Sequence, residues 1–452
     1  MVAQSSRQSA FLALRAIERG AFADVALDKV LQATGLTPLD RRLVTELVYG
    51  SVRRQRTLDA LINQLATKPA SQQPADLRLL LRLGLYQLRY LQQVPAAAAV
   101  DTTVELAKLN QLGGLAAVVN GILRQYIRLS EQDADPLQLP DDPIQRLGLR
   151  HSYPDWIVRI WLEQLGAGET GYQETERLCQ WLNQPPAIDL RVNLLRATVE
   201  QVQQAMEAAG MRVQPLPPLP TALRLTTHGG AVTQLPGFDE GWWMVQDASA
   251  QLVAYLVNPQ AGEVIADACA APGGKTLHLA ELMHDRGTVW ACDRTASRLK
   301  KLKQNRDRLG LQSIQISQGD SRQLSHLAHQ CDRVLLDVPC SGLGTLNRHA
   351  DARWRQTPDS VQELTQLQAE LLEQCSTWVK PGGCLVYATC TLHPAENEQQ
   401  IQRFLAQHPN WQLEPPDLGS PATAFVTPEG WVKIWPHRHQ MDGFFVVRLR
   451  QV

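Results

Sequence analysis

The chain has 452 residues, of which 44 are basic and 45 acidic, so its net charge is −1 at pH 7 and its isoelectric point lies near 6.8. This balance excludes a uniformly basic nucleic-acid binder but not a local basic face. No apolar run approaches the roughly 20 residues needed to cross a bilayer, and the first residues lack the apolar core of a signal peptide. We therefore expect a cytosolic protein of several domains with reduced thiols and no membrane contact.

Residues 1–130 show the periodicity of helices. Apolar side chains recur at helical spacing, for example at Leu58, Leu61 and Leu65. Several helices joined by short loops predict an all-α bundle. Arginines cluster between the apolar positions, which indicates either a solvated helix face or a face that contacts phosphates. They are Arg41, Arg42, Arg53, Arg54 and Arg56.

Residues 131–240 predict a linker followed by a small domain. The stretch up to residue 143 is acidic and broken by prolines, which is typical of an interdomain linker. A helical pattern over 156–165, an extended run over 188–193 and a second helical pattern over 198–209 follow. These patterns predict a small α+β connecting module.

From residue 241 to residue 452 apolar strands alternate with helices, which predicts an α/β domain with a doubly wound sheet. One long helix is expected over 361–379, and a hairpin over 432–435 and 444–448. The strands are expected over 264–269, 288–292, 314–317, 334–336 and 386–390.

Four aspartates lie at or near the ends of successive predicted strands: Asp267, Asp293, Asp320 and Asp337. Ligands bind at this edge of an open α/β sheet. The turn at 271–275 reads Ala-Pro-Gly-Gly-Lys, which fits a dinucleotide pyrophosphate poorly but lets the backbone approach a ligand. S-adenosyl-L-methionine has no phosphate and carries a sulfonium cation, which suits an acid-lined pocket. Asp293 is spaced to bind a ribose diol, and Asp320 can reach the adenine amino group.

Two other ligand types are not expected. The turn ends in Gly-Gly-Lys-Thr like the phosphate loop of nucleoside triphosphatases, but the first glycine of that motif is absent, so we reject an ATP-binding loop. The eight cysteines form no C-x-x-C pair, so a metal site is not expected.

Two cysteines carry the predicted chemistry. Cys340 and Cys390 each follow an apolar, strand-like run, and Asp337 lies close to Cys340 in the sequence. A thiolate that adds to carbon 6 of cytosine turns carbon 5 into a nucleophile that can take a methyl group. Asp337 could hydrogen-bond the cytosine amino group and N3. The spacing of the residues does not decide which thiol attacks.

The segments 267–276, 336–344 and 387–391 resemble the RNA 5-methylcytosine methyltransferases of the NOP/NSUN/RsmB class. The resemblance implies that Cys390 is the nucleophile and that Cys340 assists product release. DNA cytosine methyltransferases use the thiol of the Pro-Cys motif and lack the second cysteine, so the presence of both favours RNA.

The resemblance also implies a Rossmann-like catalytic domain that binds S-adenosyl-L-methionine. The residues expected to bind this cofactor are Cys269, Ala270, Ala271, Pro272, Gly273, Gly274, Lys275, Asp293, Asp320 and Asp337.

The rest of the chain resembles further parts of this class. Residues 39–50 look like a NusB-type RNA-binding domain, and segments 151–156 and 191–193 look like the connecting module. This arrangement is that of the branch that methylates a cytosine of small-subunit (16S) rRNA. We expect a monomeric enzyme with this substrate. The alternatives are a tRNA methyltransferase and a catalytically silent RNA-binding or assembly factor on the same fold.

Two further groups of side chains could face RNA or could simply be solvated. One group follows Cys340 and consists of Arg348, His349, Arg353 and Trp354. The other lies on the predicted helix after Asp293 and consists of Arg294, Arg298, Lys300, Lys301, Lys303, Arg306 and Arg308.

Overall fold

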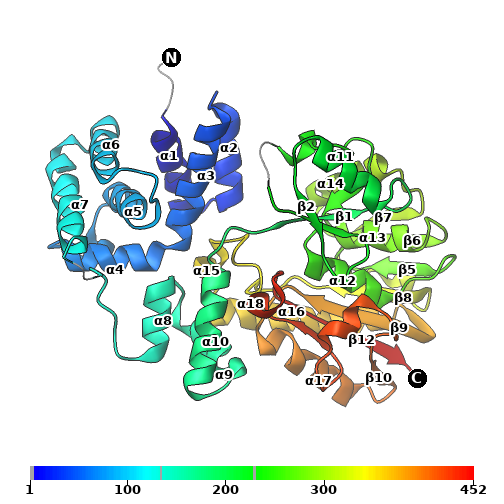
Figure 1. Ribbon diagram of the computed structural model, residues 1–452. Coiled ribbons are helices and arrows are strands. Elements are labelled where there is room, and N and C mark those ends of the chain that lie inside the picture. The colour runs from blue at the N-terminus through cyan, green and yellow to red at the C-terminus, as the bar shows by residue number, and fades with distance from the viewer. Residues whose placement is uncertain (1–4, 133–134, 228–230) are drawn as a thin grey trace. The chain divides into compact units, whose positions relative to one another are not determined.

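A computed structural model describes residues 5–132, 135–227 and 231–452, so residues 1–4, residues 133–134 of the predicted linker and residues 228–230 of the predicted connecting module lie outside the described residues. The chain forms two compact units (Figure 1). We call residues 1–184 together with 346–355 the helical unit, and residues 185–345 together with 356–452 the sheet unit. Among the described residues, no helix combines the length and apolarity needed to span a bilayer.

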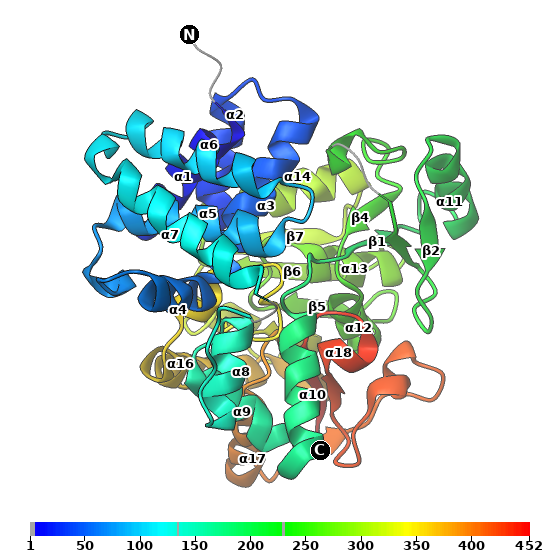
Figure 2. The same cartoon turned by 60° about the vertical axis from the view of Figure 1, so that its left-hand side comes forward.

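The helical unit contains the predicted all-α bundle. Helix α5 is its central element and packs against α1, α3, α4, α6 and α7 (Figures 1 and 2). Helix α3 begins where Thr37 accepts a hydrogen bond from the backbone of Asp40, with Pro38 at the first helical position. The helices of the bundle are α1 (Ser6–Glu18), α2 (Ala23–Ala33), α3 (Pro38–Arg53), α4 (Gln55–Leu65), α5 (Ala75–Tyr90), α6 (Ala96–Leu109) and α7 (Ala116–Ser130).

Three further helices belong to the helical unit: α8 (Pro143–His151), α9 (Asp155–Leu165) and α10 (Gly168–Trp181). Helix α8 begins inside the proline-rich stretch because Asp142 caps it by accepting a hydrogen bond from the backbone of Gln145. Proline at the first helical position is compatible with this start, because its missing N–H would have no partner in the helix.

The segment 346–355, which ends in the short helix α15 (Ala352–Arg355), also belongs to the helical unit. Arg353 is completely buried there, and its guanidinium donates to the carbonyl oxygens of Ser152 (3.1 Å) and Leu182 (3.4 Å) and to Asn183 Oδ1 (2.8 Å). The prediction that Arg353 faces RNA is therefore wrong. The reason is that backbone carbonyls in four segments, those of Arg53, Ser152, Leu182 and Leu346, require a buried donor.

The sheet unit contains a four-stranded antiparallel sheet in the order β2-β3-β1-β4. With helix α11 this sheet forms the predicted α+β module. Helix α11 begins with a reciprocal capping box between Thr198 and Gln201. The elements of this module are β1 (Ile188–Val192), α11 (Val199–Ala208), β2 (Val213–Pro215), β3 (Ala222–Leu225) and β4 (Trp243–Val245).

The larger sheet has the order β10-β12-β9-β8-β5-β6-β7, with β11 paired to β12. Strands β9, β8, β5, β6 and β7 are parallel, whereas β12 runs antiparallel to β9. The chain first builds outward from β5 to β7 and then continues on the other side of β5 with β8. This reversal creates a topological switch point between β5 and β8, where ligands bind in such folds.

The elements of the larger sheet and its covering helices confirm the predicted Rossmann-like α/β fold. They are α12 (Ala248–Val257), β5 (Val264–Asp267), α13 (Gly274–Leu282), β6 (Thr288–Asp293), α14 (Ala296–Leu309), β7 (Ile314–Gln318), β8 (Cys331–Asp337), α16 (Pro358–Ser376), β9 (Val379–Thr389), α17 (Glu398–Gln407), β10 (Trp411–Glu414), β11 (Val432–Ile434), α18 (Pro436–His439) and β12 (Phe444–Gln451).

Two local predictions differ from the structure. The helix expected to reach residue 379 ends at Ser376, and strand β9 already begins at Val379. The apolar residues 378 and 379 fit either element by pattern alone, and pairing of Val379 with Cys331 makes this segment part of the strand. The expected hairpin is present, but β12 also pairs with β9 and β10 and so lies inside the sheet.

Candidate active site

A cavity of about 380 Å³ lies at the carboxyl edge of the larger sheet, at the switch point. Both predicted thiols and most of the predicted cofactor residues line it. The lining residues that the sequence predicted for this site are Cys269, Ala271, Pro272, Lys275, Asp293, Asp320, Asp337, Cys340 and Cys390. Arg294 and Arg298, which the sequence groups with the residues that could face RNA, also line it. Ala270, Gly273 and Gly274 belong to the same turn without lining the cavity.

The glycine turn connects β5 to α13. Gly273 has a φ of 112° and precedes the first residue of the helix. A Cβ at this position would lie 2.8 Å from Cγ of Leu302, so only glycine fits both the backbone conformation and the space. The turn is thereby held close to the cavity.

Asp267 ends β5 and is buried, with Oδ2 accepting a hydrogen bond of 2.7 Å from the hydroxyl of Thr276. Burial raises the pKa of Asp267 to about 7, against the opposing effect of the Thr276 hydrogen bond. The folded state therefore binds this proton more tightly than the unfolded chain does.

This raised pKa predicts how the stability of the protein depends on pH. The stabilisation from protonated Asp267 is fully present below the unfolded pKa, near 3.8, and is lost as the pH rises through about 7. We expect Asp267→Asn to gain stability relative to the parent as the pH rises from about 4 to about 8. Urea unfolding across this range checks the prediction, with exposed Asp359→Asn as the control. A stability difference that is constant with pH would contradict it.

Asp293 and Asp320 differ in their surroundings. Asp293 is buried and accepts hydrogen bonds from the backbone N–H groups of Ala271 (3.2 Å) and Thr295 (2.8 Å), which fix its carboxylate at the cavity. Asp320 forms an ion pair of 2.6 Å with Arg322, and this pairing lowers the pKa of Asp320. The lowered pKa keeps Asp320 negative at neutral pH, and the oxygens of both side chains line the cavity, where they can accept hydrogen bonds from a hydroxyl-bearing ligand.

Lys275 joins the cofactor turn to the predicted catalytic aspartate. Its ammonium lies 2.6 Å from Asp337 Oδ2 and 4.9 Å from the ring centre of Phe444. Burial opposes its charge, but the carboxylate of Asp337 outweighs burial and raises the pKa of Lys275. The sequence placed Lys275 only in the cofactor turn, because the pairing depends on residues 62 positions apart.

The two predicted thiols lie together. The sulfurs of Cys340 and Cys390 are 3.3 Å apart, although the residues are 50 positions apart. Cys340 follows β8 and Cys390 follows β9, and these two strands are parallel neighbours. The hydrogen bond to Cys390, together with burial, raises the pKa of Cys340 well above its usual value, so Cys340 keeps its proton. One site therefore presents a protonated thiol beside a second sulfur.

The sequence did not single out Glu396 and Asn397, which lie beside the thiols. Both are fully buried and hydrogen-bonded to residues adjacent to Cys340 and Cys390. An acid and an amide a few residues after Cys390 were the available signal, but their burial is not visible in the sequence.

Several basic residues predicted to face RNA have structural roles instead. Arg308 donates to the carbonyl oxygens of Phe238 (2.6 Å) and Trp243 (3.2 Å), and Arg53 is buried with a bond of 3.0 Å to the carbonyl oxygen of Asn347. For these two residues an RNA-facing role is wrong. Exposed basic residues remain just before α14 at Arg294, on α14 at Arg298, Lys300, Lys301 and Lys303, and on α3 at Arg41 and Arg42.

Sequence comparison agrees with this architecture. The family model of the 16S rRNA methyltransferase RsmB/F matches residues 254–450, the NusB family matches 4–128, and the RsmF/B-like ferredoxin-like domain matches 153–232. The crystal structure of PH0851 is 27% identical, with a TM-score of 0.81, and covers 100% of this chain and 99% of that chain. A methyltransferase homologue from Pyrococcus horikoshii is 29% identical, with a TM-score of 0.59, over 69% of this chain and 100% of that chain.

The switch-point cavity and these matches define an S-adenosylmethionine-dependent methyltransferase. A probable ribosomal RNA small subunit methyltransferase B of Synechocystis sp. is 52% identical over 99% of both chains, and one of Bacillus subtilis is 35% identical over 99% of both. A ribosomal RNA small subunit methyltransferase B of Serratia proteamaculans is 38% identical over 93% of this chain and 92% of its own. The chain belongs to this methyltransferase B family.

The cavity fits the cofactor of this class. Asp293 lines the cavity and presents a carboxylate that can accept hydrogen bonds from hydroxyl groups. The three carboxylates in the lining, Asp293, Asp320 and Asp337, can attract a sulfonium, which supplies the methyl group when the cofactor is bound. Among the described residues, no cluster of three or more His, Cys, Asp or Glu side chains could hold a metal ion.

Proposed function

We propose that this chain transfers a methyl group from S-adenosyl-L-methionine to carbon 5 of a cytosine in small-subunit rRNA. The observation that carries the proposal is the pair of sulfurs 3.3 Å apart in the lining of the cofactor cavity, which Asp337 also lines. A methyltransferase that methylates oxygen or an exocyclic nitrogen needs no thiol, whereas carbon 5 of cytosine must first be activated by addition to carbon 6.

The proposed reaction uses each of the three side chains once. The Cys390 thiolate forms a bond to carbon 6, and carbon 5 takes the methyl group as the bond from that methyl to the cofactor sulfur breaks. A base removes the proton from carbon 5, and the carbon–sulfur bond then breaks to return the Cys390 thiolate and 5-methylcytosine. Asp337 binds the cytosine amino group and N3, and Cys340 assists the release step.

The choice of RNA rests on the family and on the helical unit. The curated relatives are named ribosomal RNA small subunit methyltransferase B, and the NusB family matches residues 4–128. The same active site could act on tRNA, so the substrate must be tested directly.

Methyl transfer from labelled S-adenosyl-L-methionine to unmodified small-subunit rRNA tests the proposal, with bulk tRNA and small subunits in parallel. The labelled RNA is then mapped for 5-methylcytosine at base resolution. One modified cytosine in the rRNA is the expected result. Label in tRNA alone would overturn the substrate, and label at another atom would overturn the chemistry.

A further inference from the structure

Glu396 is a buried acid close to the two thiols. It ends the short helical turn Pro394–Glu396 after β9, and no part of it is exposed. Within the described parts of the chain no lysine or arginine pairs with it, and burial raises its pKa despite the hydrogen bonds that it accepts. A buried carboxyl without a cation lowers the stability of the fold. The residues to which Glu396 is hydrogen-bonded therefore indicate its role.

These hydrogen bonds hold the residues on both sides of Cys340. Glu396 Oε1 accepts from the backbone N–H of Ser341 (2.9 Å), and Oε2 accepts from the Ser341 hydroxyl. Gln368 on α16 donates to Glu396 Oε1 and to the carbonyl oxygen of Pro339, both at 2.9 Å. The backbone around Cys340 is therefore fixed from before and after the cysteine.

The next residue, Asn397, holds both neighbours of Cys390 in the same way. Its Oδ1 accepts from the hydroxyl of Thr389 (2.6 Å), and its Nδ2 donates to the carbonyl oxygen of Thr391 (3.0 Å). The hydroxyls of Thr391 and Ser341 lie 2.7 Å apart and connect the two loops directly.

We propose that Glu396 and Asn397 form a latch that sets the separation of the Cys340 and Cys390 sulfurs. They are positioning residues, since their contacts are to the neighbours of the cysteines and not to the sulfurs. The value of this positioning for methyl transfer rests on the proposed function, but the geometry can be tested without RNA. Two loops tied through a shared buried network move together, so loss of one member should separate the sulfurs.

The rate of disulfide formation measures this separation. The azo oxidant diamide takes two electrons and two protons from the pair, which leaves a hydrazine and a Cys340–Cys390 disulfide that peptide mass spectrometry quantifies. We expect Glu396→Ala to slow the reaction roughly tenfold or more, because the thiols lose their high effective concentration. Glu396→Gln, which keeps an acceptor for Ser341 N–H, should slow it less.

Gln400→Ala is the matched control, because Gln400 is buried on α17 and bonds the backbone of Thr365 without contacting either cysteine loop. Thr391→Val removes one tie between the loops at constant size and should give an intermediate rate, which keeps the test decisive if Glu396→Ala does not fold. Rates equal to the control in both variants would overturn the latch. Absence of methyl transfer in the parent would overturn the proposed function but leave this result intact.

With active enzyme, we expect Glu396→Ala to lower kcat while the KM for RNA stays constant.

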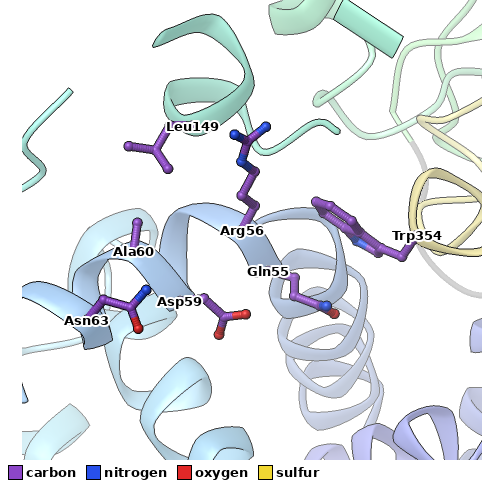
Figure 3. Close-up of a pocket in the computed structure, with 7 residues that line it drawn as sticks. All are labelled: Gln55, Arg56, Asp59, Ala60, Asn63, Leu149 and Trp354. Carbon is purple, nitrogen blue, oxygen red and sulfur yellow. The ribbon is translucent and has the colours of Figure 1, made fainter. Parts of the chain in front are cut away.

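A second inference comes from the helical unit, where a hollow of about 330 Å³ lies between α4, α8 and segment 346–355 (Figure 3). Its charges are already paired, Arg56 with Asp155 (2.6 Å) and Asp59 with Arg82 (2.7 Å). The lining residues are Gln55, Arg56, Asp59, Ala60, Asn63, Leu149 and Trp354.

The groups left for a ligand are neutral. The amide of Gln55 has no hydrogen-bond partner among the described residues, and Asn63 uses only Oδ1, which accepts from the backbone of Ala70 (2.7 Å). Trp354 donates Nε1–H to the carbonyl oxygen of Val52 (2.7 Å), so its ring is fixed in the wall. Free amides beside a fixed aromatic ring are the groups with which proteins bind unstacked RNA bases.

The geometry points to a subsite for one unpaired RNA base other than the target cytosine. Only the identity of the RNA rests on the proposed function. Fluorescently labelled single-stranded homopolymers of A, C, G and U are the probes. We expect the full chain to bind at least one of them and Gln55→Ala/Asn63→Ala to weaken this binding about tenfold. Exposed Gln72→Ala, outside the hollow, should leave it unchanged. No binding by the parent, or equal binding by all three proteins, would overturn the subsite, whatever the outcome of the methylation assay.

Discussion

Replacement of Cys390 by alanine should abolish methyl transfer. The expected loss is on the order of 10⁴-fold or more, because the variant lacks the nucleophile that activates carbon 5. The rate is measured with labelled cofactor and unmodified rRNA. Cys179→Ala is the control, since Cys179 is buried in α10 of the helical unit. Turnover by Cys390→Ala within tenfold of the parent would contradict the proposed role.

Replacement of the second thiol should give a different result. Cys340→Ala keeps the nucleophile, so addition to carbon 6 proceeds, but release is slow and a covalent protein–RNA adduct accumulates. The high pKa of Cys340 is consistent with this role, because a protonated thiol next to Cys390 does not compete as a nucleophile. Denaturing electrophoresis detects the adduct. Normal turnover without an adduct would contradict the division of roles.

Arg353→Met should strongly destabilise the protein. The guanidinium is completely buried, stacks 4.1 Å from the ring centre of Tyr153 and donates to backbone carbonyls of several segments. Burial lowers the pKa of Arg353 to about 10. The hydrogen bonds of the guanidinium offset the unfavourable free energy of burying its charge. Loss of the donor leaves several buried acceptors unsatisfied, at about 1–3 kcal/mol each, so we expect a loss of at least about 4 kcal/mol in total.

Urea unfolding of the full chain, followed by circular dichroism, measures this loss. Arg353→Lys tests whether the planar shape of the guanidinium is needed, because a single ammonium cannot reach acceptors that lie around the whole guanidinium. This variant should recover less than half of the stability that Arg353→Met loses. Exposed Arg42→Met is the matched control and should stay within about 0.5 kcal/mol of the parent. An equally small change for Arg353→Met would contradict the buried role.

The features that could be predicted from the sequence depend on local pattern. The glycine turn, the strand-terminal acids and the two cysteines follow apolar runs whose ends mark the carboxyl edge of a parallel sheet, so Cys340 and Cys390 were expected at one edge. The separation of 3.3 Å between the two sulfurs cannot be predicted from the sequence. It depends on the pairing of β8 with β9 and on the hydrogen bonds of Glu396 and Asn397.

Charged and polar residues far from the turn were predicted less well. Arginines are typical of a solvated or RNA-facing surface, yet Arg53, Arg308 and Arg353 each donate to backbone carbonyls. Whether a guanidinium lies in solvent or in the interior depends on which carbonyls the tertiary fold leaves unpaired. No periodicity in a single sequence reports those carbonyls, and for the same reason no pattern in the sequence marks Glu396 as buried.

Because segment 346–355 belongs to the helical unit, the chain cannot be cut once to give the two units as separate fragments. The chain leaves the sheet unit after residue 345 and re-enters it at residue 356. A fragment of residues 1–184 would lack the guanidinium that satisfies the carbonyls of Ser152 and Leu182. A fragment beginning at residue 185 would carry Arg353 and Trp354 without their partners. Recombination that exchanges the whole helical unit must therefore also replace the ten residues 346–355, which lie within the sequence of the sheet unit.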